Sequence, residues 1–268
     1  MEKEIRIINE SRGMVCVTMA SERFYLRLEK DKEGLPAVIA RPSSTWIASY
    51  YYTSPYLIKW IADKGMTESE RIRDAAGVKG SRVHKAIDMW LDDVEIKIDT
   101  KIPNEDTGRE EELTVEENEC FKSFIEFYKK VKPEIVAHNY TVWGEKYAGT
   151  VDVLCKIDGE LGILDVKSGQ TVVREHELQV SSYKHASGKP EEIKKLWILQ
   201  VGYKKNKVRW KLTEVEDKFK LFLNAYDTWE EENTNATPKY IEYPTVYSTK
   251  KELDALELPK KEAKVETD

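Results

Sequence analysis

Apolar and polar residues alternate with a period of two near the N-terminus, as at Ile5 and Ile7 and again at Val15 and Val17. This period is typical of half-buried strands. We therefore expect two or three antiparallel strands, which form an N-terminal β extension over residues 1–41.

Helical spacing then replaces the alternation. Ser43-Ser44 offers an N-cap for an aromatic-rich helix. Apolar residues four, seven and eight positions apart predict another helix, which begins at Gly80-Ser81 and ends near residue 93. The stretch from Asp99 to Glu112 is polar and contains a proline and a glycine, so it predicts an exposed acidic loop.

Helices and strands follow one another through the rest of the chain. The expected order is a helix at 115–130, strands at 135–143, 147–157 and 162–167, a helix at 175–186, strands at 196–203 and 207–212, and a helix at 215–231. It predicts an α/β fold with a mixed central β-sheet flanked by helices, over residues 42–248. Residues 249–268 are rich in Lys and Glu without an aromatic, so we expect a charged, frayed or disordered tail.

Two of these strands flank a turn at Asp158-Gly159, and this turn sets their register. A hairpin centred there pairs residues whose numbers sum to 317, which places Asp152 across from Asp165. Lys167 lies two residues beyond Asp165 and therefore on the same strand face. The register predicts that two acids and one lysine converge.

Such charges can also face solvent on an amphipathic hairpin, without any chemistry. The apolar run of Ile163, Leu164 and Val166 favours buried strands instead. Buried acids need partners, and opposed carboxylates repel each other unless positive charge lies between them. A divalent cation is the natural candidate.

The composition bounds the class of protein. Of the 268 residues 40% are hydrophobic and 34% are charged, which suits a globular protein, and no run approaches the ~20 apolar residues of a membrane span. No apolar segment follows Met1-Glu2-Lys3-Glu4, so we expect a cytoplasmic protein without membrane association. Cys16, Cys120 and Cys155 are odd in number and widely spaced, as expected of reduced core residues.

Charge is unevenly distributed. The formal net charge of −6 argues against a protein that coats nucleic acid indiscriminately. Residues 88–119 hold thirteen acids and three bases, whereas residues 184–211 hold nine bases and two acids. The basic stretch is either a solvated face or a site for phosphates. Its candidate nucleic-acid-binding residues are Lys204, Lys205, Lys207 and Arg209.

Four short motifs together resemble a known superfamily. They are Gly80-x-x-x-His84, Gly149-Thr150-x-Asp152, Asp165-x-Lys167 and Gln179-x-x-x-Tyr183. In this order and spacing they resemble the RecB-like branch of the PD-(D/E)XK nucleases. The segment Pro42–Ile47 is similar to the opening helices of phage exonucleases and mitochondrial genome maintenance exonucleases.

The resemblance implies a role for each matched residue. Asp152, Asp165, Lys167, Gln179 and Tyr183 would be catalytic. Mg²⁺ or Mn²⁺ would be held by His84, Asp152, Asp165 and the carbonyl of Val166, since hard oxygen ligands suit Mg²⁺ and an imidazole makes the site more hospitable to Mn²⁺. Lys167 would stabilise the charged phosphorane or orient the attacking water.

Two positions depart from the family pattern. Relatives often carry a glutamate on the strand before the Gly-Thr-x-Asp motif, where this chain has His138-Asn139. Relatives with an iron–sulfur cluster need three cysteines after the nuclease core, and none follows Cys155. We therefore expect no iron–sulfur cluster.

The resemblance favours a metal-dependent deoxyribonuclease, with an exonuclease acting at the ends of DNA as the first choice. Its partners would be DNA, including single strands, and recombination or replication proteins in a bacterial or phage-infected cell. A structure-specific endonuclease remains an alternative, as does a catalytically idle member of the fold that binds nucleic acid or protein.

Overall fold

The computed structural model describes residues 4–9, 14–19, 22–30, 36–51, 53–104 and 108–238. The expected charged tail therefore lies outside the described residues. Along the chain the elements are β1 (Glu4–Asn9), β2 (Met14–Met19), β3 (Glu22–Lys30), β4 (Pro36–Pro42), α1 (Ser44–Ala48), α2 (Pro55–Lys64), α3 (Met66–Leu91), β5 (Lys101–Asn104), β6 (Arg109–Glu112), α4 (Val115–Val131), β7 (Glu134–Trp143), β8 (Ala148–Ile157), β9 (Glu160–Lys167), α5 (Arg174–Ala186), β10 (Lys195–Val201), β11 (Trp210–Glu214) and α6 (Phe219–Glu232).

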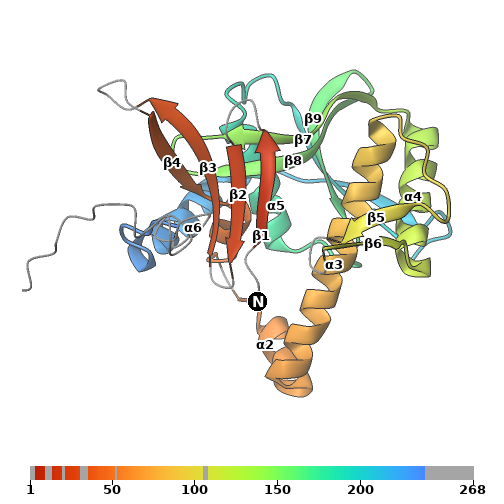
Figure 1. The fold of residues 1–268 in the computed structure, drawn as a ribbon, viewed down its shortest axis with the longest axis horizontal. Coiled ribbons are helices and arrows are strands. Elements are labelled where there is room, and N and C mark those ends of the chain that lie inside the picture. Colours follow the sequence, from red (N-terminus) through yellow and green to blue (C-terminus); the bar gives the residue numbers. More distant parts are fainter. Residues whose placement is uncertain are drawn as a thin grey trace, which may run out of the picture.

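A five-stranded mixed sheet forms the centre of the molecule (Figure 1). Its strands are in the order β11-β10-β9-β8-β7. β9 and β10 are parallel, and the other neighbours are antiparallel. A parallel pair needs a crossover connection, and α5 supplies it. The predicted α/β class with a mixed, helix-flanked sheet is confirmed at this level.

Helices cover both faces of this sheet. On one face Ile163 and Ile198 pack among side chains of α1, α5 and α6. On the other face Leu164 and Leu199 pack against side chains of α3 and α4. The alternation of period two along β9 and β10 thus divides the core into two layers.

A second sheet contains the N-terminal strands in the order β1-β2-β3-β4. All neighbours are antiparallel, as predicted, but there are four strands rather than two or three. Phe24 and Leu26 of β3 enter the core beside α1 and α5, so the N-terminal sheet packs against the main domain.

The expected loop between Asp99 and Glu112 contains a two-stranded antiparallel hairpin, β5–β6, so that prediction is wrong. Ile102 is fully buried against Ala86 of α3 and Leu113. This long-range packing orders a segment whose local sequence is that of a loop, and tertiary contacts commonly override local preference in this way.

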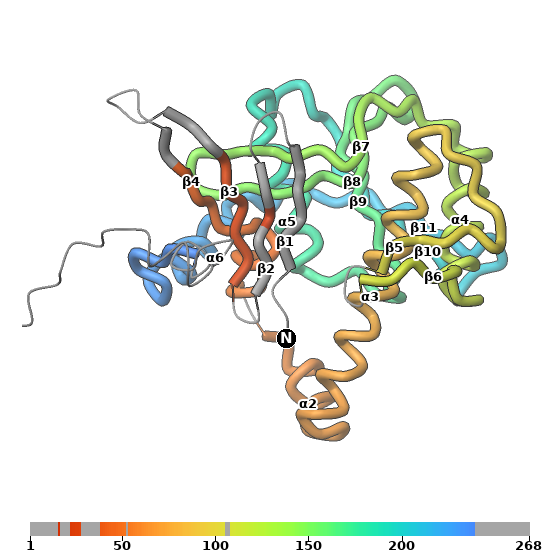
Figure 2. Tube along the Cα trace, viewed as in Figure 1, coloured from red at the N-terminus to blue at the C-terminus, as the bar shows by residue number. Residues whose placement is uncertain are grey.

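The expected helix start at Gly80-Ser81 is also wrong, because α3 runs without a break from Met66 to Leu91. His84 consequently lies deep in the helix rather than in its first turn. The N-terminal half of α3 and all of α2 extend away from the rest of the molecule (Figure 2). No residue of α2 is buried, and Tyr56 of the aromatic-rich segment is 87% exposed.

The cysteine prediction is confirmed, since all three are buried and free. None of the helices in the described ranges has the length and apolar content needed to cross a membrane.

Candidate active site

The register predicted for the β8–β9 hairpin is confirmed over five pairs, from Ile157–Glu160 to Val153–Leu164. The ladder ends there, one step before Asp152 and Asp165. In place of a backbone pair, the carboxylate of Asp152 accepts a hydrogen bond from the backbone N–H of Val166 at 2.7 Å. The two acids are therefore neighbours at the open end of the hairpin.

A left-handed residue of β7 lies across from the point where the ladder ends. β7 pairs with β8 through His138–Val153 and Tyr140–Val151, and Asn139 between them has φ of 44°. Asparagine is among the few residues that adopt this left-handed conformation readily. In this register Asn139 therefore lies opposite Asp152.

Asp165 is 1% exposed and lies beside the ammonium group of Lys167. Lys167 Nζ donates a hydrogen bond to Oδ1 of Asp165 at 3.0 Å and lies 2.8 Å from Oδ2. Burial raises the pKa of Asp165 to about 6, and the Asp152 charge adds to this effect while Lys167 opposes it. Burial lowers the pKa of Lys167, but the two acids outweigh it and raise the pKa above its ordinary value.

α5 positions Lys167 from the other side. The Gln179 Oε1 atom accepts a hydrogen bond from Lys167 Nζ at 3.1 Å. Its Nε2 atom donates to the hydroxyl of Tyr183 at 2.5 Å and to Oγ1 of Thr45 at 3.1 Å. Residues four apart share a helix face, so the Gln-x-x-x-Tyr spacing places both side chains at the site.

The glycine of the Gly-Thr-x-Asp motif makes room for Tyr183. A Cβ atom at Gly149 would lie 2.3 Å from Cε1 of Tyr183 and 3.1 Å from Oγ of Ser44. Ser44 Oγ in turn donates to the carbonyl of Ala148 at 3.1 Å. The start of α1 thus meets β8 and α5 at this glycine. This packing brings together the Pro42–Ile47 segment, the Gly-Thr-x-Asp motif and the Gln-x-x-x-Tyr motif.

His84 reaches the same place from α3. Its Nε2–H donates to the carbonyl of Val166 at 2.8 Å, and Nδ1 lies 3.6 Å from Oδ1 of Asp152. In the neutral ring a proton on Nε2 leaves Nδ1 as an acceptor. Nδ1 of His84 and Oδ1 of Asp152 are then two acceptors that face each other, and a proton or a cation between them would satisfy both.

Asp88 and His138 also lie at this cluster, although neither was predicted from the sequence. Burial raises the pKa of Asp88, and Asp152 adds to the effect, while His84 and His138 oppose it. His138 Nδ1 lies 3.4 Å from Asp88, and its Nε2 lies 3.2 Å from Asp92. The available signal was the spacing of Asp88, four residues after His84 on one helix face.

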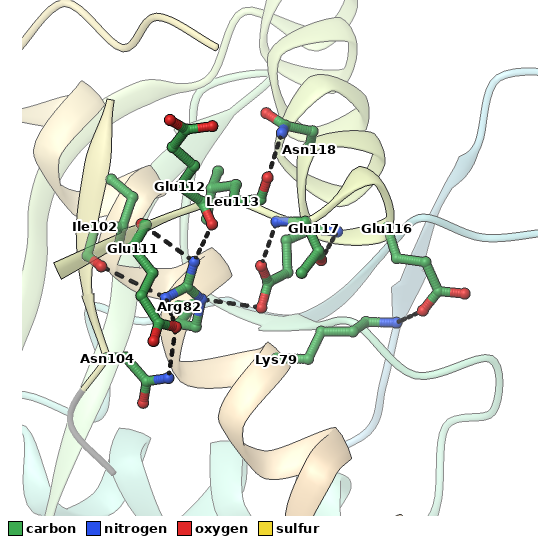
Figure 3. A network of polar contacts seen from close by, with 11 residues as sticks. Lys79, Arg82, Ile102, Asn104, Glu111, Glu112, Leu113, Glu116, Glu117 and Asn118 are labelled. Carbon is green, nitrogen blue, oxygen red and sulfur yellow. Dashed lines mark hydrogen bonds and ion pairs between the residues drawn. The ribbon is translucent and has the colours of Figure 1, made fainter. Parts of the chain in front are cut away.

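A buried arginine anchors the helix that carries His84 (Figure 3). Arg82 is 3% exposed and contacts Glu117 of α4 through Nε at 3.1 Å. Its Nη2 atom donates to the carbonyls of Glu111 at 3.3 Å and Glu112 at 2.6 Å. One side chain of α3 thereby holds β6 and the N-terminus of α4.

The donor types at the site fit a divalent cation, but they are not arranged as a preformed metal centre. Within the described ranges, no group of three or more His, Cys, Asp or Glu side chains is placed to hold a metal ion. His84 and the Val166 carbonyl are bonded to each other, so one ion could bind both only if that hydrogen bond were replaced. Asp165 Oδ2 is buried and makes no hydrogen bond, but it lies 2.8 Å from the Lys167 ammonium, so a metal ion would share this oxygen with the lysine.

The basic residues of the β10–β11 turn lie next to the loop that follows Lys167. Gln170 of that loop accepts from the backbone N–H of Lys204 at 2.7 Å. Two of the four side chains already have acidic partners, with Lys204 3.6 Å from Glu116 and Arg209 2.6 Å from Glu119. The acidic and basic segments of the chain therefore meet and partly neutralise each other.

No model of a known protein family matches this chain, and no curated protein matches it. The interpretation of the site therefore depends on its residues and their geometry.

Proposed function

We propose that this chain is a metal-dependent deoxyribonuclease of the PD-(D/E)XK superfamily, RecB-like branch, that hydrolyses phosphodiester bonds at DNA ends. The observation that carries the proposal is the position of the Lys167 ammonium, which lies between Asp165 and Gln179 at the end of β9. Asp152, His84 and the Val166 carbonyl lie around the same strand end.

Each group has a task in this reaction. A bound Mg²⁺ or Mn²⁺ would activate water and neutralise charge on the leaving oxygen, with His84, Asp152, Asp165 and the Val166 carbonyl as its protein ligands. Lys167 holds positive charge where negative charge develops on the phosphoryl oxygens. Gln179 fixes the ammonium, and Tyr183 and Thr45 fix the amide of Gln179.

The buried surroundings support this assignment. An ion pair that is exposed to water contributes little to stability. Here the side chain of Asp165 is nearly inaccessible to water, and the side chain of Lys167 is partly buried. A buried lysine with acidic partners retains its proton near neutral pH, as an electrostatic role requires.

The test is incubation of the purified chain with end-labelled linear DNA and covalently closed circular DNA, single- and double-stranded, in Mg²⁺ or Mn²⁺. An exonuclease degrades the linear molecules and leaves the circles intact. Cleavage of closed circles assigns an endonuclease instead. Binding without cleavage in either metal assigns an idle member of the fold, and the Asp152→Asn variant controls for contaminating nucleases.

A further inference from the structure

Arg23 of β3 brings a positive charge from the N-terminal sheet to the edge of the candidate active site. The backbone carbonyl of Arg23 accepts a hydrogen bond from the N–H of Ser43 at 2.9 Å. Ser43 in turn bridges Ala148, the residue before the Gly-Thr-x-Asp motif. The backbone of β3 is thus held beside the start of β8 through one intervening residue, Ser43.

The side chain of Arg23 lies on the strand face that meets β8. Residues two apart share a face of a strand, and the neighbour at that spacing, Tyr25, donates to or accepts from Oγ1 of Thr150 at 3.0 Å. Thr150 is two residues from Asp152. Arg23 therefore approaches the motif that carries the first acid.

The guanidinium of Arg23 has no carboxylate partner among the described residues. Its Nε atom is buried and makes no hydrogen bond. Burial lowers the pKa of Arg23, but Tyr25, Cys16 and Tyr183 outweigh burial and raise the pKa above its ordinary value. An arginine keeps its proton, so a positive charge stays on this partly exposed side chain with no carboxylate beside it.

This charge also acts on Lys167. Arg23 is close enough to Lys167 for the two positive charges to repel each other. Two cations that repel each other at the edge of a site are costly unless an anion joins them. The phosphate groups of a DNA strand supply that anion, and arginine suits phosphate because its planar fork donates two parallel hydrogen bonds.

We infer that Arg23 is a phosphate-binding residue, which holds a phosphate of the DNA strand beside Lys167. The inference rests on the proposed nuclease function and extends it, because it gives the N-terminal sheet a part in substrate binding. A phosphate within the strand and a phosphate at its 5′ end present the same chemistry.

The test compares Arg23→Met and Arg23→Lys with Arg27→Met. Arg27 is a matched control on the same strand, because its guanidinium lies 4.4 Å from the centre of the Trp143 ring. Affinity for a labelled single-stranded oligonucleotide is measured in EDTA over a range of salt concentrations. Arg23→Met should weaken binding about tenfold and reduce the slope of log K against log salt by about 0.7. Arg23→Lys should keep the parent's slope of log K against log salt. Arg27→Met should match the parent in both affinity and slope.

Thermal unfolding separates this role from a structural one. Arg23 makes no ion pair with a described carboxylate that the fold would lose, so Arg23→Met should melt at the same temperature as the parent or higher. A lower melting temperature with unchanged DNA affinity and salt slope would overturn the inference. Comparing oligonucleotides with and without a 5′ phosphate identifies the source, since only a terminal site loses affinity when that phosphate is removed.

Inorganic phosphate keeps failure of this inference distinct from failure of the nuclease assignment. Phosphate, compared with chloride at equal ionic strength, should raise the melting temperature of the parent and of Arg27→Met but not of Arg23→Met. If the parent shows that shift and cleaves no DNA, the nuclease proposal fails and the anion site stands. If the parent cleaves DNA and Arg23→Met binds and cleaves equally well, the inference about Arg23 fails alone.

Discussion

Lys167 Nζ lies 2.8 Å from Oδ2 of Asp165, and the carboxylate side chain is 1% exposed while the lysine side chain is 20% exposed. The charge of Asp165 depends on Lys167 for compensation, because the carboxylate is shielded from water. Lys167 is partly exposed, so water also solvates its charge. If Lys167 has the proposed catalytic role, its removal has two separable effects, one on the chemistry and one on the buried charge of Asp165.

Lys167→Met should nearly abolish cleavage and change DNA affinity only a few-fold, since one ammonium beside the reacting phosphate acts mainly on the transition state. At pH 8 the variant should also lose about 1–3 kcal/mol of unfolding free energy, because Asp165 is left ionised without a partner. The folded pKa of Asp165 is raised to about 6, so protonation favours the folded state at low pH and this contribution is lost as pH rises through 6.

The loss of stability should therefore be smaller at pH 5 than at pH 8, as measured by urea denaturation. Lys195→Met is the control, because its partners Glu160 and Glu214 are exposed, and it should cost less than about 1 kcal/mol. A collapse of both DNA binding and folding at every pH would make Lys167 a structural ion-pair partner.

Gly149→Ala should disturb the site without touching a charged group. The new Cβ would lie 2.3 Å from Cε1 of Tyr183, so the ring must move and its contact with Gln179 weakens. We expect a loss of about 1–3 kcal/mol in stability from overpacking, together with a lower kcat. Gly77→Ala in α3 has nothing within 4 Å of the new atom and should be neutral or stabilising. Equal stability and activity in both variants would contradict the close packing at Gly149.

The sequence predicted the hairpin register and the convergence of the four motifs because both follow from local rules. Turn residues fix a strand register, and residues four apart share a helix face. Neither rule predicts the left-handed conformation of Asn139 opposite Asp152, or the approach of Arg23 from a separate sheet. The β5–β6 hairpin was not predicted for the same reason, because Ile102 is ordered by its burial against α3 rather than by its neighbours in sequence.

His176 should make the fold sensitive to mild acid. Burial lowers the pKa of His176 to about 3, and the nearby Lys167 adds to the effect. The unfolded chain binds a proton at this residue below about 6.5 and the folded chain does not, so stability falls as pH drops from 6.5 towards 3. His176→Gln should remove this dependence, which approaches about 1.4 kcal/mol per pH unit. Urea denaturation between pH 6.5 and 5 measures it, and parallel curves for parent and variant would show that His176 titrates normally.

The basic turn divides into two pairs that should behave differently. Lys204 and Arg209 already contact Glu116 and Glu119, whereas Lys205 and Lys207 make no ion pair with any described residue. If the turn binds the DNA backbone, Lys205→Gln with Lys207→Gln should flatten the slope of log K against log salt by about 0.7–0.9 for each contact. The double variant at Lys204 and Arg209 should flatten it less. An unchanged slope in both double variants would mean that the turn is a solvated face that does not bind DNA.

Asp152→Asn tests the proposed metal site directly. The carboxylate of Asp152 accepts from the Val166 N–H at 2.7 Å, and an asparagine oxygen can accept the same bond. The metal-free variant should therefore be as stable as the parent, or slightly more stable, because it removes repulsion with Asp165 and Asp88.

Addition of Mn²⁺ should separate the two proteins. A cation that binds only the folded parent stabilises it by RT ln(1 + [L]/Kd), about 2.7 kcal/mol at a hundredfold excess over Kd. The melting temperature of the parent should rise, while Asp152→Asn should lose most of that rise together with its activity. The Asp93→Asn variant is a suitable control, because Asp93 is exposed at the C-terminal end of α3, and it should keep the full shift. A full Mn²⁺ shift in Asp152→Asn would mean that the ion binds elsewhere, and the two carboxylates at the end of the hairpin would then have to be explained without a metal.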